Sequence, residues 1–462
     1  MNLLIAITGL GILCLLFEIL NLRKALVPLV ILGLLGCLAI DVYEFGTVVS
    51  SNNNMIAVNN FSAAFSALFI ILTIFLVALS HNFYENHQSK ISDYIAIKVF
   101  MLAGCVALVS FQNLAMFFLG IEVLSISLYI LAASNRLNIK SNEAGMKYFL
   151  MGSFASAILL FGICLIYGAI GTFNVYDAGT DVPSLQLASG SAAVEEWLPI
   201  GTILLSIGLL FKIAAVPFHF WAPDVYQGSP ALTTATMSTI GKVAAMAAFF
   251  KLAVVMNVNL PAAQSVIVVV SILSMSVGNI MALRQSNVKR MLAFSGVSHA
   301  GFMLMTLLGT ENPSGTLFYY SAAYALAGIA AFSVILYVCK NRDNEDITNF
   351  NGLGKTNPLL AAVLTGALLS MAGIPIFAGF FAKLILFGQV ISAGYIALVI
   401  VAVVNSIISV GYYFKLILAM YTKEPNEERT GTPILIYATA VISISLNIAM
   451  GLFPSVIIDL LS

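Results

Sequence analysis

Apolar segments of roughly 20 residues follow one another along the whole chain, separated by polar connections that are mostly short. An α-helix needs about 20 predominantly apolar residues to cross a hydrocarbon layer of ~30 Å. The pattern therefore predicts an all-α integral membrane protein with about fourteen transmembrane helices. These helices are predicted near residues 2–22, 25–45, 61–80, 95–111, 113–134, 143–170, 199–222, 231–256, 261–282, 290–308, 315–340, 358–390, 394–421 and 432–460.

The composition excludes a water-soluble globule. Of the 462 residues, 60% are hydrophobic and 9% are charged, whereas soluble domains carry about 25% charged residues. The formal net charge of +0 argues against nucleic acid as a partner. The five cysteines stand singly in apolar segments, and we expect buried hydrophobic side chains rather than disulfides or metal ligands. The first apolar segment lacks a signal-peptide cleavage pattern and is predicted to remain as a helix.

The basic residues divide the connections into two sets. If the connections alternate between two sides and the N-terminus is outside, most of the 20 Lys and Arg residues fall on the inside. Because cytoplasmic connections are enriched in Lys and Arg, both termini are predicted on the outer side. The inside set is Arg23, Lys24, Lys90, Lys98, Arg136, Lys140, Lys147, Arg284, Lys289, Arg290, Lys340, Arg342, Lys355, Lys423 and Arg429. The outer connections carry Asp41, Glu44, Asp177, Asp181, Glu195, Glu196 and Glu311.

Charged residues inside the predicted helices are the main functional candidates. A charge near the middle of a bilayer costs at least about 2.5–3.5 kcal/mol, so those that persist usually serve transport. Glu122, Lys212 and Lys242 are predicted near mid-membrane, where the alternative to a functional role is a structural buried ion pair. Lys251 and Lys415 lie near helix ends, and we expect both to extend their ammonium groups to the interface.

Two of the predicted helices contain breaks beside a lysine. The segment 358–390 is too long for one straight span and contains Gly373 and Pro375, so a break there would place Lys383 inside the membrane. Pro217 follows Lys212 by five residues. Broken helices at membrane depth survive only where protein or a watery cavity satisfies the freed backbone groups.

These two breaks predict an internal repeat. They fall in the seventh and twelfth helices, so helices 4–8 and 9–13 would form two five-helix repeats of opposite orientation, a plan common in transporters. The predicted divisions are an N-terminal three-helix segment (1–90), the first repeat (91–256), the second repeat (257–422) and a C-terminal helix (423–462).

The four histidines do not form a metal or haem site. His299 is predicted mid-helix and His219 follows Pro217, and each could relay protons or simply pack. His81 and His87 are predicted in a solvated connection. The sequence has no metal-ligand spacing, no bis-histidine pair and no phosphate-binding loop. We therefore expect no redox centre in this chain.

Two motifs resemble those of the antiporter-like family, the proton-translocating subunits of complex I and of Mrp-type antiporters. The first is FKIAAVPFHFWAPDVYQGSP at 211–230, and the second is ALRQSNVKRMLAFS at 282–295, followed by Ser298 and His299. The resemblance covers nearly the whole chain. Within the family, Lys383 in place of a glutamate and the lack of a long C-terminal lateral helix favour the N-type subunits.

The resemblance implies a role for each buried charge. Glu122 and Lys212 correspond to an ion pair whose separation controls the lysine's hold on its proton, Lys242 to a central relay and Lys383 to the terminal relay. His299 is a further relay candidate because an imidazole titrates near neutral pH. The resemblance also implies a bacterial inner-membrane location and neighbouring antiporter-like subunits as partners. NADH, FMN, iron–sulfur clusters and quinone would be held by the rest of the complex.

Two other functions stay open at this point. A subunit of an Mrp-type cation/proton antiporter would have the same helices without a redox drive. A structural membrane scaffold would use its buried charges only to join helices. Four separate mid-membrane charged sites argue against the scaffold.

Overall fold

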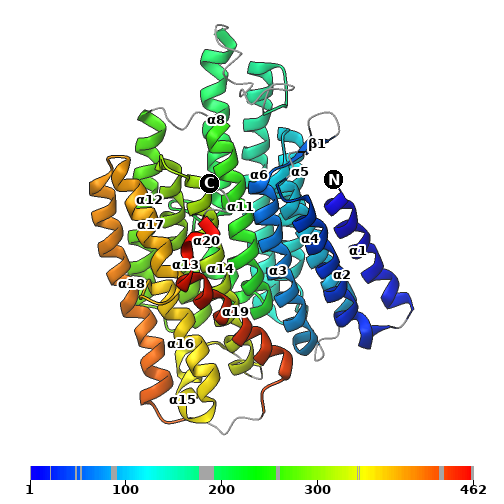
Figure 1. The fold of residues 1–462 in the computed structure, drawn as a ribbon, viewed down its shortest axis with the longest axis vertical. Helices are drawn as coiled ribbons and strands as arrows, with labels where there is room; N and C mark the ends of the chain where they lie inside the picture. Colours follow the sequence, from blue (N-terminus) through cyan, green and yellow to red (C-terminus); the bar gives the residue numbers. More distant parts are fainter. Residues whose placement is uncertain are drawn as a thin grey trace.

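The computed structural model describes residues 2–20, 22–46, 49–51, 55–84, 91–175, 192–255, 261–340, 342, 344–425 and 431–458, and nearly all of them are helical (Figure 1). Several predicted positions lie outside the described residues or side chains: Lys24, His87, Lys90, Asp177, Asp181, Glu195 and Arg429.

The helices follow the predicted order. Their bounds are α1 Asn2–Ile19, α2 Arg23–Glu44, α3 Asn60–Tyr84, α4 Ile91–Ser110, α5 Leu114–Ala132, α6 Ile139–Ile170, α8 Ala192–Lys212, α9 Trp221–Gly228, α10 Ala231–Thr236, α11 Lys242–Val255, α12 Pro261–Leu283, α13 Val288–Leu304, α14 Pro313–Val338, α15 Leu353–Thr356, α16 Pro358–Ala372, α17 Ala378–Ser392, α18 Ile396–Thr422, α19 Ile434–Leu452 and α20 Pro454–Ile458. A π-helical turn, η1 (Met237–Gly241), joins α10 to α11, and 3₁₀ turns cover Met305–Leu308 (η2) and Ile347–Phe350 (η3).

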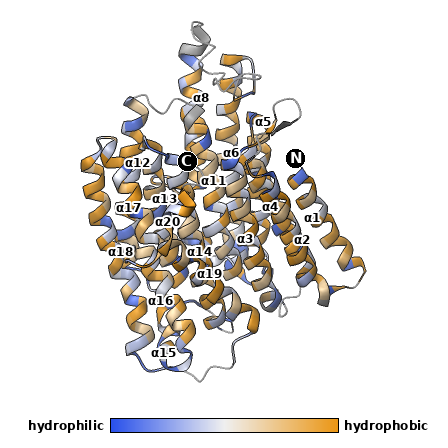
Figure 2. Ribbon diagram, in the orientation of Figure 1, coloured by the Kyte–Doolittle hydropathy of each residue, from blue (hydrophilic) through white to orange (hydrophobic). Residues whose placement is uncertain are grey.

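Eleven helices of the described chain are long and apolar enough to cross a membrane, and the shorter apolar helices α16 and α17 accompany them. The ribbons of α1 and α2 are mostly apolar (Figure 2), and large apolar side chains of the outer helices, such as Ile5, Leu32 and Ile407, are exposed, as expected where lipid replaces water. The spans of α13 and α14 are 94% buried, whereas that of α1 is 28% buried. The chain is therefore a multi-span membrane protein whose centre is built on α13 and α14.

The two ends of the bundle differ in charge. At one end, the connections after α5, α12 and α14 meet around Arg136, Lys140, Lys289, Lys340 and Arg342, and we call this the basic end. Lys140, Lys289, Lys340 and Arg342 line one pocket there. At the opposite end a hairpin pairs β1 (Val49–Ser51) with β2 (Ile56–Val58). Asn113 bridges to Asn174 beside it, and Gln389 bonds to the carbonyl of Glu311.

Some predicted boundaries and environments were wrong. Helix α4 begins at Ile91 rather than 95, so Lys98 lies inside a spanning helix with 0% of its side chain exposed, and not in a connection. Asp41 is likewise inside α2 and 3% exposed. His81 lies in the last turn of α3. Cys14, Cys37 and Cys105 are buried as predicted, but Cys164 is exposed and Cys339 is partly exposed. The hairpin was not predicted, because its six paired residues give too short a pattern.

Candidate functional site

Lys212 is the last residue of α8, where the helix stops inside the bundle. The following Ala214 has a φ of 58°, which is uncommon for a residue with a side chain. The freed backbone groups find partners: the Ala215 N–H bonds the Leu210 carbonyl at 2.9 Å, and the indole of Trp221 donates to the Phe211 carbonyl at 2.9 Å. The predicted break near Pro217 is therefore present and internally satisfied.

The Lys212 ammonium bonds to three hydroxyl groups. It donates to Ser125 Oγ at 2.6 Å, to Tyr129 OH at 3.2 Å and to Ser156 Oγ at 3.2 Å. These partners come from α5 and α6. A lysine at a helix C-terminus is also favoured by the helix dipole. The site thus holds a buried positive charge without a carboxylate in contact.

Glu122 lies on α5 one turn before Ser125. Its charge interacts with that of Lys212, but no oxygen of Glu122 lies within 4.0 Å of the Lys212 ammonium nitrogen. Its buried Oε1 has no hydrogen-bond partner among the described atoms. The two predicted partners are therefore near neighbours on one polar surface, with Ser125 bonded to the lysine in place of the carboxylate.

Lys242 begins α11 immediately after the π-helical turn η1. It is 3% exposed. A Cβ atom on Gly296 would lie 2.6 Å from the Lys242 ammonium nitrogen and 3.2 Å from Tyr324 OH. Because only glycine leaves this space, Gly296 of α13 lets the ammonium approach the polar interior beside Tyr324. Single π-helical turns are common at functional sites.

His299 lies between Lys242 and Lys383. It is on α13, one turn after Gly296, and interacts electrostatically with both lysines. Its Nδ1 is 2.8 Å from Tyr320 OH and its Nε2 is 3.3 Å from Tyr413 OH. Tyr413 OH continues to Ser295 Oγ at 2.5 Å. The imidazole is thus held in a chain of hydroxyl groups.

Lys383 lies on α17, just after the predicted break between α16 and α17. In the break, Gly373 has a φ of 87° and Ile376 a φ of 88°. The Lys383 ammonium donates to the Met371 and Ala372 carbonyls at 3.2 and 2.8 Å and to Ser406 Oγ at 2.9 Å. It therefore binds the carbonyls that a continuous helix would have used.

A small cavity of about 10 Å³ connects His299 with Lys383 and is also lined by Tyr320, Tyr324 and Ser370. Such a cavity is close to the smallest that holds one water molecule. The structure therefore brings Lys242, His299 and Lys383 into one region, while Lys212 and Glu122 form a second cluster.

The other charged candidates differ from expectation. Lys251 does not reach the interface: it is 9% exposed and donates to the Val109 carbonyl at the end of α4 at 3.2 Å. Lys415 is exposed as predicted and donates to the Gln285 carbonyl at 3.0 Å. His219 is 6% exposed and its Nδ1 has no hydrogen-bond partner among the described atoms.

Sequence reasoning missed the tyrosine and serine residues around these lysines. Ser125, Tyr320 and Tyr413 are ordinary residues of apolar helices, and they meet the charged groups only across contacts distant in sequence. Lys98 was also missed as a buried group. Its position in the sequence could have revealed it: Lys98 is the eighth residue of α4 once the helix is taken to begin at Ile91. Within the described chain, no group of three or more His, Cys, Asp or Glu residues could hold a metal ion.

Comparison with known proteins gives a consistent family. Residues 111–409 match the family described as NADH:quinone oxidoreductase/Mrp antiporter, TM. NADH-quinone oxidoreductase subunit N of Flavobacterium johnsoniae is 73% identical, with both chains covered completely, and that of Cytophaga hutchinsonii is 42% identical, covering 100% of this chain and 99% of its own.

Solved structures agree with this family. A chain of respiratory complex I from Thermus thermophilus is 30% identical with a TM-score of 0.84, covering 99% of this chain and 98% of that one. A chain of the Mrp complex from Dietzia sp. has a TM-score of 0.88 at 24% identity, covering 99% of this chain and 95% of its own, which shows a shared fold. The chain therefore belongs to the NADH:quinone oxidoreductase/Mrp antiporter transmembrane family, and to the branch of that family whose members are named subunit N.

Proposed function

We propose that this chain is the membrane subunit N of a proton-translocating NADH:quinone oxidoreductase, and that it carries protons while other subunits carry electrons from NADH to quinone. The observation that carries the proposal is a set of buried basic groups: Lys212, Lys242 and Lys383 beside interruptions of their helices, and His299 within α13. Relatives over the full chain length carry that subunit name.

The chemistry of these sites suits reversible proton binding. Burial disfavours the charged form of a lysine, whereas hydrogen-bond acceptors and a nearby carboxylate favour it. Lys212 has hydroxyl partners and a nearby Glu122, and Lys383 has two carbonyls and a hydroxyl. Small changes at each site therefore shift the balance between ammonium and neutral amine. Moving Glu122 away from Lys212 would push a proton from Lys212 towards Lys242, His299 and Lys383.

The membrane arrangement follows the same proposal. The chain has fourteen spans, with α8 and α9 forming a broken seventh and α16 and α17 a broken twelfth. Spans 4–8 (91–256) and 9–13 (257–422) form two inverted repeats, between an N-terminal segment (1–90) and a C-terminal helix (423–462). The basic end faces the cytoplasm, so both termini lie on the periplasmic side of the inner membrane.

The division of labour assigns redox chemistry to partner subunits. NADH, FMN, iron–sulfur clusters and quinone bind elsewhere in the complex, and neighbouring antiporter-like membrane subunits contact this one. The likeness to an Mrp chain at 24% identity concerns the fold, so a redox-independent antiporter is the second candidate. Co-purification of the native complex separates the two, because only the oxidoreductase would bring flavin and iron–sulfur subunits with it.

The central test removes the first charged cluster. Lys212→Ala and Glu122→Ala should assemble and keep NADH:ferricyanide activity, which takes electrons before the coupled step, but lose most quinone-linked proton pumping. Glu122→Asp should lose less, because it keeps the charge and shortens its reach. Full pumping by an assembled Lys212→Ala complex would contradict the proposal.

A further inference from the structure

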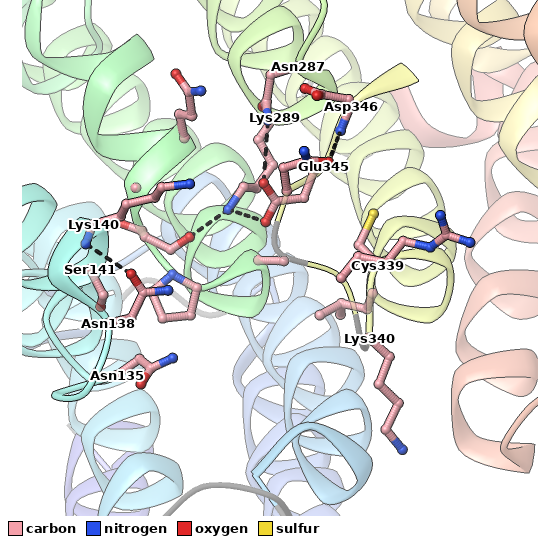
Figure 3. A pocket seen from close by; sticks show the side chains of 18 of the residues that line it. Asn135, Asn138, Lys140, Ser141, Asn287, Lys289, Cys339, Lys340, Glu345 and Asp346 are labelled. Carbon is pink, nitrogen blue, oxygen red and sulfur yellow. Dashed lines mark hydrogen bonds and ion pairs between the residues drawn. The ribbon is translucent and has the colours of Figure 1, made fainter. Parts of the chain in front are cut away.

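A polar pocket of about 400 Å³ opens at the basic end (Figure 3). Its walls come from the end of α5, the start of α6, the junction of α9 and α10, the start of α13 and the segment after α14. Residues Asn135, Lys140, Asn287, Lys340 and Asp346 are among those that line it. At ~30 Å³ per molecule, this volume holds roughly ten water molecules.

A buried ion pair fixes the wall of this pocket. The Lys289 ammonium is 2.7 Å from Glu345 Oε1 and donates to the Ser229 carbonyl at 2.7 Å (Figure 3). The Ser229 hydroxyl is buried and has no hydrogen-bond partner in the described chain. Buried hydroxyls without a protein partner are usual where ordered water completes the network. The pocket is therefore suited to hold water against the protein interior.

Two stacked tyrosine rings connect residues beside this pocket to a fully buried lysine. Phe83 and Asn135 line the pocket. Tyr84 follows Phe83 in the chain, and Ser134 precedes Asn135. Tyr84, next to Phe83, stacks on Tyr94 with ring centroids 4.5 Å apart. Tyr94 OH donates to the Ser134 carbonyl at 2.9 Å, next to Asn135. Of the two rings, Tyr84 is thus next in the chain to Phe83 and Tyr94 is hydrogen-bonded next to Asn135, and both Phe83 and Asn135 line the pocket.

Lys98 lies against the Tyr84 ring. Its ammonium is 4.8 Å from the centre of the Tyr84 ring and donates to Ser80 Oγ at 2.6 Å. The described charged and histidine side chains on the helices packed against α4, and on α4 itself, are Glu18 of α1, Arg23, Asp41 and Glu44 of α2, His81 of α3, Asp93 of α4, Glu122 of α5, and Lys242 and Lys251 of α11. No carboxylate of the described residues lies within 4.0 Å of the Lys98 ammonium.

We propose that the pocket at the basic end is the proton-uptake vestibule of this chain and that Lys98 is the first group it loads. The proposal rests on the proposed function. Hydronium in the pocket gives its proton to the neutral Lys98 amine when the Tyr84–Tyr94 pair admits water, leaving water behind. The ammonium forms with its bond to Ser80, and later release of that proton inward restores the amine. A purely structural Lys98 would instead tie α4 to α3 through Ser80.

The test uses the assembled complex in inverted membrane vesicles, whose outer medium bathes the basic end. Lys98→Met removes the proton site, and Lys98→Arg keeps the charge but cannot release its proton. We expect both variants to keep NADH:ferricyanide activity and to lose quinone-linked pumping about tenfold near pH 8, and less near pH 6, where protons are abundant. Lys251→Met, at the opposite end of α4, is the matched control and should keep its pumping rate per assembled complex.

A structural Lys98 predicts a different pattern. Lys98→Arg would then pump normally, or both variants would lose activity equally at the two pH values, and either result overturns the proposal. If Lys212→Ala also pumps normally, the proposed function fails together with it. If the Lys98 variants pump normally while Lys212→Ala does not, the proposed function stands and the proposed uptake route is wrong.

The native thiol of Cys339 tests the pocket without any change in Lys98, because Cys339 lines the pocket. A bulky, membrane-impermeant maleimide added to inverted vesicles should label Cys339 and slow quinone-linked turnover. In the Cys339→Ala variant, the same treatment should leave quinone-linked turnover unchanged. Absence of labelling, or complete labelling without loss of turnover, would exclude the pocket as the uptake route. This labelling experiment tests the uptake route even if the Lys98 variants fail to assemble.

Discussion

Hydroxyl oxygens and backbone carbonyls, rather than carboxylates, bind the ammonium groups of Lys98, Lys212 and Lys383. Lys289 differs, because Glu345 lies 2.7 Å from it. A carboxylate in contact would hold the proton on the lysine more strongly than neutral oxygens do. At the residue scale, the neutral partners are what allow a buried lysine to bind a proton and also to lose it.

The close approach of Lys242 to Gly296 predicts an effect of substituting this uncharged residue. Gly296→Ala would place a Cβ 2.6 Å from the ammonium nitrogen, so the ammonium must move away from position 296. We expect an assembled complex with quinone-linked turnover lowered several-fold, because misplacement by about 1 Å is costly in proton relays and other tuned sites. NADH:quinone activity, normalised to NADH:ferricyanide activity, measures the effect.

Gly388→Ala is the matched control for that substitution. Gly388 lies in α17, and a Cβ there would meet no atom within 4 Å. The same helical Gly→Ala change should leave turnover unaltered. Equal activity of the two variants would show that the close approach of Gly296 to Lys242 does not matter for transport.

The sequence predicted the charged residues better than their partners. Glu122, Lys212, Lys242 and Lys383 are recognisable because a charge in an apolar segment is conspicuous. Their hydroxyl partners could not be predicted, since Ser125 and Lys212 are 87 positions apart and serine is common in membrane helices. Lys98 was misplaced because Ser92, Asp93 and Tyr94 lower the hydropathy of the first turn of α4.

At the scale of the elements, breaks in the helices position the lysines. Glycine and proline at 373 and 375 are local signals, so the division into α16 and α17 could be predicted, and the structure confirms it. The π-helical turn before Lys242 could not, because Met237–Gly241 contains no residue specific to that geometry. The turn also packs against distant parts of the chain, since a Cβ on Gly328 of α14 would lie 2.8 Å from the Thr239 side chain.

The break between α16 and α17 leads to a prediction for Lys383. Lys383→Ala should impair NADH:quinone turnover, because the Met371 and Ala372 carbonyls lose their proton-bearing partner and blocked proton exit slows a coupled reaction. NADH:ferricyanide activity in the same membranes should persist. A parallel fall of both activities would indicate damaged assembly, and unchanged quinone activity with normal pumping would remove Lys383 from the path.

The burial of Lys251 gives a different expectation for that residue. Its ammonium binds the Val109 carbonyl at the C-terminal end of α4, where the helix dipole favours a cation. Lys251→Ala should therefore reduce stability by about 1–3 kcal/mol through an unsatisfied carbonyl, while each assembled complex pumps at the normal rate. Thermal inactivation of purified complex measures the first effect and vesicle acidification the second. A pumping defect without lost stability would contradict this capping role.

At the scale of the whole molecule, the proposed function gives this chain the proton relay and leaves the redox chemistry to other subunits. Purified alone in detergent, the subunit should show no flavin, haem or iron–sulfur absorption and no NADH oxidation. Ultraviolet–visible spectra and an NADH oxidation assay check this directly. A bound chromophore that survives removal of every partner subunit would refute the division of labour.

The proposed relay also has a consequence for where the membrane potential acts. Lys212 and Lys383 both lie where a helix stops within the bundle, and His299 lies between Lys242 and Lys383. A proton passed sideways among sites of similar depth crosses little of the transmembrane field. Crossing the whole field costs about 2.3 kcal/mol per charge for each 100 mV. Under the proposed relay, the opposing voltage would act mainly on proton uptake at one face and release at the other, and transfers between sites of equal depth would respond mainly to local electrostatics.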